Sequence, residues 1–124
     1  MNEVKFEDLK GLTLVDVRNV ANEEIVFVTN TGVSFKLYHC QDCCENVRVD
    51  DICGELSDLV GVPILQAEES TNKENPPGVK PEYQDSFTWT FYRLATTKGS
   101  VVIRWYGESN GYYSESVDFA QTYP

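Results

Sequence analysis

The stretch that decides the fold is residues 24–39, Glu-Ile-Val-Phe-Val-Thr-Asn-Thr-Gly-Val-Ser-Phe-Lys-Leu-Tyr-His. Apolar residues recur at every second position on both sides of a short turn, which is typical of two strands that each bury one face. A three-residue loop, Asn30-Thr31-Gly32, with Gly32 in the left-handed conformation, would join the strands as a hairpin. The side chains predicted to point inward are Ile25, Phe27, Thr29, Val33, Phe35, Leu37 and His39.

Segments with strand-like patterning extend on both sides of this hairpin. Residues 12–20 form a strand that leads into it through a turn at 21–23, and residues 6–9 add a short helical turn. After it, 46–50 reads as a short strand and 63–67 as another. Apolar spacing at i, i+3 and i+4 predicts a short helix over Glu55–Val60, which Gly61 and Pro63 then end.

Residues 68–84 are rich in Asn, Pro, Gly and charge, so we expect a long exposed loop there. Beyond it the chain is an aromatic meander. Phe87, Trp89 and Phe91 alternate with threonines and are predicted to face the core, with a bulge near residues 92–93 that returns Leu94 to that face.

The last predicted hairpin turns at Ser109-Asn110-Gly111. A three-residue loop there pairs Val101 with Phe119 and Ile103 with Val117, which builds a better core than a two-residue loop would. We therefore expect a mainly β fold, an antiparallel meander or rolled sheet of about seven strands with one short helix near residues 55–60. The α+β class stays open as an alternative, and residues 1–124 are expected to form a single domain.

Twenty acidic residues against ten basic ones give a net charge of −10, which opposes binding to nucleic-acid phosphates and to anionic membranes. We expect no direct nucleic-acid binding, no membrane association, and a partner with a basic surface. No signal-peptide pattern or long apolar run is present, which favours a cytoplasmic protein. In a reducing cytosol the four cysteines are expected to be free thiols or metal ligands.

One seven-residue run, His39-Cys40-Gln41-Asp42-Cys43-Cys44-Glu45, holds the single histidine and three of the four cysteines. The two-residue spacing of Cys40 and Cys43 suits zinc, with His39 or Cys44 as further ligands. Cys53 is isolated, and a structural site usually needs a second paired segment. We therefore expect no cofactor, with zinc open as the alternative, and favour ordinary buried cysteines.

The same run allows a catalytic interpretation. Cys43 or Cys44 would be the nucleophile, His39 the base, and Asp42 or Glu45 the carboxylate that orients it. Catalytic groups are normally assembled from separated segments, so adjacency in sequence does not establish their geometry. A structural, hydrogen-bonded histidine is the interpretation we favour.

Six acids between Asp42 and Asp58, set against Arg48, place five net negative charges in seventeen residues. Such a patch can hold a cation, mimic phosphates or simply be solvated. For contact with a partner we select the acids Asp50 and Asp51, with Tyr106 and Tyr112 as outward aromatics.

Several motifs together resemble an uncharacterised family of small proteins of tailed bacteriophages and prophages. They are Gln41-Asp42-Cys43-Cys44-Glu45, Asp50-Asp51-Ile52 with Gly54, Thr88-Trp89-Thr90-Phe91-Tyr92, and Trp105-Tyr106-Gly107-Glu108-Ser109-Asn110-Gly111-Tyr112-Tyr113-Ser114. The resemblance spans roughly residues 9–118. It implies a phage accessory protein in the cytoplasm of the host bacterium, and it does not require Cys40, which weakens the zinc interpretation.

Three functions follow as hypotheses. The leading one is a small acidic phage accessory protein that binds and modulates a host factor without catalysis, in host takeover or against host defence. The alternative is a metal- or thiol-dependent enzyme centred on His39, Cys43, Cys44 and Glu45. A third is sequestration of a small ligand, such as a nucleotide, on the aromatic face. Outward aromatics also leave a homo-oligomer open.

Overall fold

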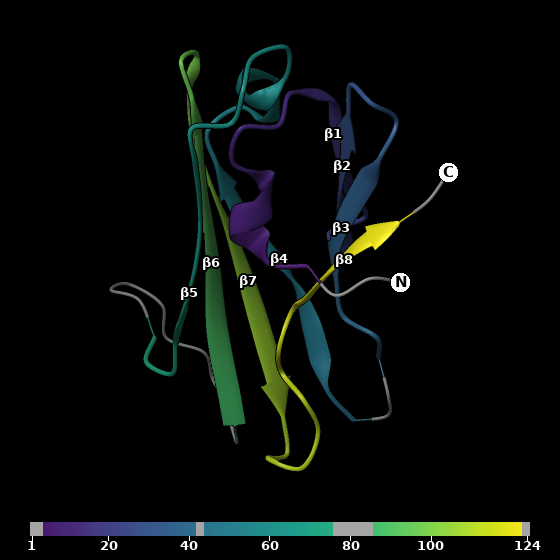
Figure 1. Cartoon of the computed structure of the whole chain (residues 1–124). Helices are drawn as coiled ribbons and strands as arrows, with labels where there is room; N and C mark the ends of the chain where they lie inside the picture. The colour runs from purple at the N-terminus through teal and green to yellow at the C-terminus, as the bar shows by residue number, and fades with distance from the viewer. Residues whose placement is uncertain (1–3, 42–43, 76–85, 123–124) are drawn as a thin grey trace.

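The computed structural model describes residues 4–41, 44–75 and 86–122. Eight strands form two four-stranded antiparallel sheets that face each other (Figure 1), so the predicted β class is confirmed. The first sheet has the order β1 (Leu14–Val20), β2 (Glu24–Thr29), β3 (Ser34–Tyr38), β8 (Asp118–Thr122). The second has the order β4 (Asn46–Cys53), β7 (Gly99–Ser109), β6 (Ser86–Thr96), β5 (Gln66–Asn72).

The β2–β3 hairpin forms in the predicted register. Ile25 pairs with Leu37 and Phe27 with Phe35, and all four side chains are buried. Gly32 has a φ of +90°, the left-handed conformation that the turn requires and that glycine adopts without steric cost. The alternating sequence therefore fixes both the pairing and the inward face of this hairpin.

The core lies between the two sheets, and the N-terminal 3-10 turn η1 (Phe6–Leu9) is inserted into it (Figure 1). The ring of Phe6 lies 4.7 Å from that of Tyr92 in the second sheet and 5.3 Å from that of Phe119 in the first, measured between centroids. Phe6 and Leu9 are both buried. The turn predicted at residues 6–9 thus joins the two sheets through apolar contacts.

The segment between β4 and β6 departs from prediction in two places. The expected helix at 55–60 is a single 3-10 turn, η2 (Leu56–Leu59), because Val60 is already extended and begins a bridge to Leu14. The strand expected at 63–67 begins at Gln66 and runs to Asn72, so the loop predicted from residue 68 was wrong for 68–72. Pairing with β6 satisfies this polar backbone. Positions 76–84 of that loop lie outside the described residues.

The face of strand β6 that was predicted to point into the core points outward, and its other face points inward. Its pairing with β7 is uninterrupted from Ser86 to Thr96, so the bulge predicted at 92–93 is absent from this ladder. Tyr92 and Leu94 therefore face the core, and Trp89 lies on the outer face with only 2% of its surface exposed. Trp89 is covered there by the Tyr106 ring, 4.6 Å away, which explains how a large aromatic residue is buried outside the core.

The last strand also differs from prediction. Instead of forming a hairpin with β7, the chain crosses from the second sheet to the first, where β8 pairs with β3 and Phe119 lies opposite Leu37 (Figure 1). The predicted pairs Val101 with Phe119 and Ile103 with Val117 were therefore wrong. The Phe119 ring stacks on Phe35 at 5.5 Å, so aromatic contacts within the first sheet favour the crossing.

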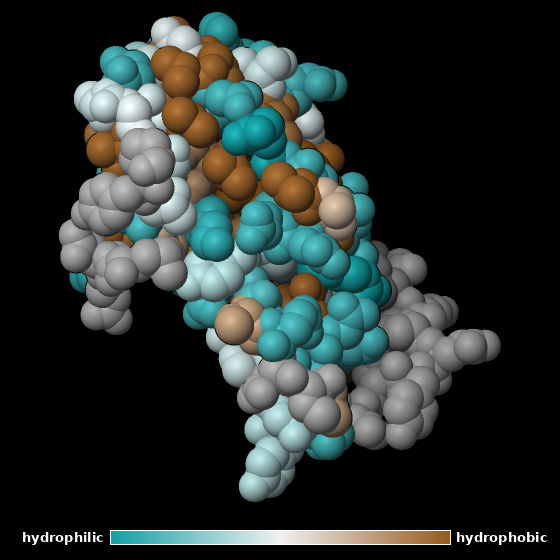
Figure 2. Space-filling model, turned by 90° about the vertical axis from the view of Figure 1, so that its right-hand side faces the viewer, coloured by the Kyte–Doolittle hydropathy of each residue, from teal (hydrophilic) through white to brown (hydrophobic). Residues whose placement is uncertain are grey.

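Figure 2 views the molecule from the right-hand side of Figure 1, the side of the first sheet, and shows hydrophobic and hydrophilic residues interspersed. On the outer face of this sheet, half-buried Val26 lies beside Lys36, which forms an ion pair with Glu24 at 3.6 Å. Among the described residues, no helix has the length and hydrophobicity needed to cross a bilayer.

Candidate functional site

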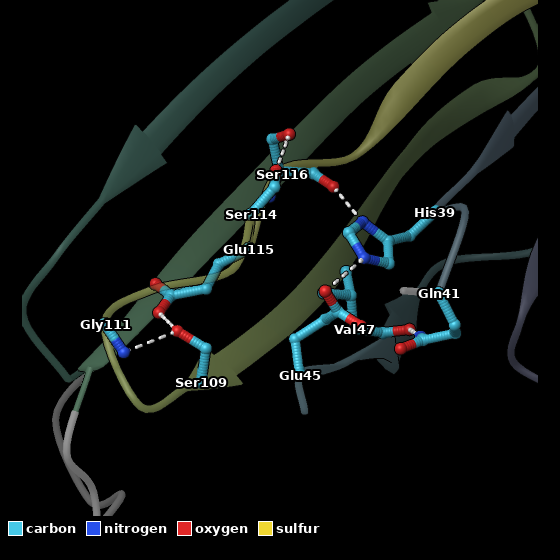
Figure 3. A network of polar contacts seen from close by, with 9 residues as sticks. All are labelled: His39, Gln41, Glu45, Val47, Ser109, Gly111, Ser114, Glu115 and Ser116. Atoms are coloured by element: carbon cyan, nitrogen blue, oxygen red, sulfur yellow. Dashed lines mark hydrogen bonds and ion pairs between the residues drawn. The ribbon is translucent and has the colours of Figure 1, made fainter. Parts of the chain in front are cut away.

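His39 lies just after β3, where the predicted inward direction is confirmed by a side chain that is only 4% exposed. Its Nδ1 lies 2.7 Å from the carbonyl oxygen of Ser116 (Figure 3). A carbonyl can only accept, so Nδ1 carries a proton and donates it. The other nitrogen, Nε2, lies 3.8 Å from a carboxylate oxygen of Glu45, whose side chain is 1% exposed. The structure thus brings together two of the residues selected from the cysteine run.

Three of the four cysteines lie among the described residues, and none of these three is a buried thiol as predicted. Cys40 and Cys53 are free thiols, and both are exposed. Cys44 is disulfide-bonded, so the prediction of a free thiol or metal ligand was wrong at this position. Cys43 and Asp42 lie outside the described residues. Within the part of the chain that the structure describes, no three His, Cys, Asp or Glu side chains are grouped to hold a metal ion.

Glu115 anchors the segment that crosses between the sheets. Its buried carboxylate accepts hydrogen bonds from the Thr88 hydroxyl at 2.9 Å and the Ser109 hydroxyl at 2.5 Å. Burial alone would raise the pKa of this carboxyl. Hydrogen bonds from Ser109, Ser86 and Thr88, together with the charge of Lys73, outweigh burial and hold the pKa below its ordinary value. Glu115 is therefore an ionised structural group at neutral pH.

The Trp-Tyr-Gly-Glu-Ser-Asn-Gly motif is explained by the same segment. A Cβ atom at Gly107 would lie 2.5 Å from the carbonyl oxygen of Glu115, so only glycine permits this approach. Gly111 has a φ of +92°, and its amide donates to the Ser109 hydroxyl at 2.9 Å. Asn110 accepts a hydrogen bond from the amide of Tyr112. The motif thus builds a turn and leaves the Tyr112 side chain projecting.

The four residues predicted to contact a partner differ in exposure and in their contacts. Tyr112 is 88% exposed and Asp51 is exposed, whereas Asp50 is engaged by Arg104 at 2.6 Å. Tyr106 is directed outward but is only 5% exposed, so its prediction as an exposed contact was wrong. It is covered by Trp89, a packing partner on the neighbouring strand that the assumed faces of β6 had placed in the core.

A groove that sequence reasoning missed lies between β5 and β8, the last strands of their sheets. A hollow of about 790 Å³ there has an apolar floor and an acidic rim. The apolar lining residues are buried or half-buried and form the floor: Val4, Phe6, Val117, Phe119 and Ala120. The exposed charged residues Lys5, Glu7, Glu69 and Asp118 form the rim, and half-buried Tyr38 lies among them. A second hollow of about 390 Å³ shares Glu69 and Val117 with it, so the two hollows adjoin each other. No local pattern signals this groove, because its walls come from distant segments.

The negative charge of the groove affects the pKa of Tyr92, a buried core residue. Burial raises the pKa of Tyr92, and the negative charges of Glu69 and Asp118 raise it further. Glu69 lies on β5 and Asp118 on β8, so both walls contribute negative charge at one place. The groove therefore favours a positively charged occupant.

Comparison with known proteins adds a family to this geometry. A family model described as "Domain of unknown function (DUF7448)" matches residues 7–119, which include both sheets and the crossing segment up to Phe119 in β8. No curated protein and no solved structure matches the chain.

Proposed function

This chain belongs to the DUF7448 family, a domain of unknown function, and we propose from its geometry that it is a non-catalytic binding protein. It holds a positively charged, extended segment of a partner protein in the groove between β5 and β8. The observation that carries this proposal is the acidic rim of Glu7, Glu69 and Asp118 above an apolar floor.

Charge favours this occupant over others. Three carboxylates and one lysine, Lys5, line the larger hollow, and the whole chain carries a net charge of −10. Complementary charge speeds encounter with a basic partner and opposes acidic ones, including nucleic acids. The apolar floor, which includes Phe119, supplies contact area for the aliphatic stems of lysine and arginine.

The strands beside the groove favour an extended segment. Strands β5 and β8 each end their sheet in the described part of the chain, so each has a second backbone edge that pairs with no described strand. An extended peptide can add to such an edge through main-chain hydrogen bonds, while alternate side chains enter the pockets beside it. The groove therefore suits a segment with basic residues at every second position.

The phage setting implied by the sequence motifs makes a host protein in the bacterial cytoplasm the expected partner. Binding would modulate that host factor, in host takeover or against host defence. Exposed Tyr112 lies beyond the end of β7, on the loop that leads to the smaller hollow through Gly111 and Tyr113. It is placed to widen the contact surface at one end of the groove.

A direct test uses two fluorescein-labelled heptapeptides, one alternating Lys and Val and the other alternating Glu and Val. We expect fluorescence anisotropy to show saturable binding of the lysine peptide alone, weakening as salt is raised. Glu69→Gln and Asp118→Asn should each lower affinity roughly two- to fivefold, as expected for one partly exposed ion pair. The matched variants Asp51→Asn and Glu55→Gln, outside the groove, should leave affinity unchanged.

Two outcomes would refute the proposal. One is equal binding of the glutamate peptide, which would show that charge does not select the occupant. The other is an affinity for the lysine peptide that responds to Asp51→Asn as much as to Glu69→Gln, which would place binding on the general acidic surface.

A further inference from the structure

A further pocket, separate from the two hollows of the groove, lies at the opposite side of the sandwich. Strands β4 and β1 end their sheets there, and the turn between β1 and β2 closes over β4, with the Asn22 carbonyl accepting a 2.7 Å hydrogen bond from the Val49 amide. The enclosed volume is about 360 Å³, enough for a small metabolite. Its walls are Ala21, Asn22, Glu23, Glu24, His39, Gln41, Asn46, Val47 and Arg48.

Two buried nitrogen atoms on the walls of this pocket have no hydrogen-bond partner. They are Nε2 of His39 and Nη1 of Arg48. A buried polar atom without a partner is costly, and two in one pocket call for an explanation. The Arg48 guanidinium stacks on the Tyr106 ring at 5.5 Å, and no described carboxylate forms an ion pair with it. Its planar fork of N–H groups is suited to donate two hydrogen bonds to the carboxylate of a ligand.

Other groups near the pocket favour a positively charged part of a ligand. Nδ1 of His39 donates to Ser116, so in the neutral imidazole Nε2 is an acceptor that faces the Glu45 carboxylate 3.8 Å away. An N–H donor from a ligand would satisfy Nε2. Glu23, exposed in the turn, adds a negative charge, while Glu24 is paired with Lys36.

These two requirements are met together by one chemical class. We propose that this pocket binds a small zwitterion of the free amino acid type. Its carboxylate is held by Arg48, and its ammonium group is held by Nε2 of His39 and the carboxylate of Glu23. The side-chain amide of Asn46, which also lines the pocket, can donate to the carboxylate or accept from the ammonium group.

The test compares a zwitterion with its two halves. L-alanine, propionate and ethylammonium are titrated into ¹⁵N-labelled protein while the ring nitrogens of His39 and the Nε of Arg48 are followed by NMR. Alanine is expected to shift both residues, and each half to bind roughly tenfold more weakly, because it makes one set of charged hydrogen bonds instead of two.

Variants separate the two ends of the ligand. Arg48→Gln should abolish alanine binding, whereas Arg93→Gln, which removes an exposed arginine stacked on Phe91 of the same sheet, should not. Glu23→Gln alters an exposed side chain, so the fold is retained. It should weaken the binding of alanine but not of propionate. Glu55→Gln is the control for this variant. Glu69→Gln in the groove should leave alanine binding intact, so this site and the groove fail independently.

Three results would overturn the proposal. Propionate that binds as tightly as alanine would make the pocket a simple anion site. A protonated Nε2 at neutral pH would make His39 and Glu45 a closed ion pair with no place for an ammonium group. Absence of saturable alanine binding in the wild-type protein would mean that bound water, not a ligand, pairs with Nε2 of His39 and Nη1 of Arg48.

Discussion

Nδ1 of His39 donates a hydrogen bond to the carbonyl oxygen of Ser116 across 2.7 Å, and this contact ties the end of β3 to the segment that enters β8. The neighbouring residue, Glu115, is held by hydroxyl groups of the second sheet, on β6 and β7. The crossing segment is therefore fixed to both sheets at adjacent residues (Figure 3). His39, Ser116 and Glu115 therefore have a structural role, since their contacts hold the crossing segment in place.

Replacement of His39 by Ala should lower the free energy of unfolding by about 2 kcal/mol, since it removes a buried hydrogen bond and leaves a small cavity. Urea denaturation measures the loss. Hydrogen exchange should accelerate at the amides of 115–118 more than in the β2–β3 hairpin. Uniform acceleration in both regions would contradict a specific role of His39 in holding the crossing segment.

Gly107→Ala should destabilise the protein by about 2 kcal/mol, because the new Cβ would meet a backbone carbonyl 2.5 Å away and one strand must move. Gly99→Ala is the matched control. There the new Cβ meets the carboxylate of Asp58, the far end of a flexible side chain that can move aside. Thermal unfolding of both variants should rank Gly107→Ala as the less stable, and equal losses would argue against the close approach.

Stability should depend on pH through Glu115. Its pKa in the folded protein lies below the ordinary value of 4.5, so the unfolded chain binds the proton more readily. The stabilisation is therefore fully present above pH 4.5 and is lost as the pH falls through the lower folded value. Glu115→Gln should cost about 1–2 kcal/mol at pH 7 in urea unfolding, with a gap that narrows under acid. Glu55→Gln, at an exposed position, should behave like wild type, and a constant gap at all pH values would count against this assignment.

Trp89→Ala should destabilise the protein by about 3 kcal/mol although Trp89 lies on the outer face, because the indole is covered by Tyr106 and its Nε1 donates to Asn75. Phe91→Ala, on the same face but half-buried, should cost clearly less. Guanidinium unfolding distinguishes the two. Losses of equal size would favour the arrangement in which both rings face the core.

The sequence by itself determined the elements whose pattern is local. The β2–β3 hairpin was predictable to the register, since its loop is three residues long and apolar residues occupy the inner face at Ile25, Phe27, Phe35 and Leu37. The inward direction of His39 followed from that register. The short turn at 6–9 and the first strand were also predictable, because turn residues and period-two patterning suffice to define them.

Only the tertiary structure decided which face of β6 is inside and where β8 pairs. Apolar or aromatic residues occupy both faces of β6, so its alternation fits either orientation, and the choice depends on Tyr106 covering Trp89 from the neighbouring strand. Strand β8 can satisfy its backbone beside β7 or beside β3, and the aromatic contacts of Phe119 with Phe6 and Phe35 select β3. The groove and the pocket depend on these same choices, because each is walled by strands that are distant in sequence and meet only when the two sheets pack.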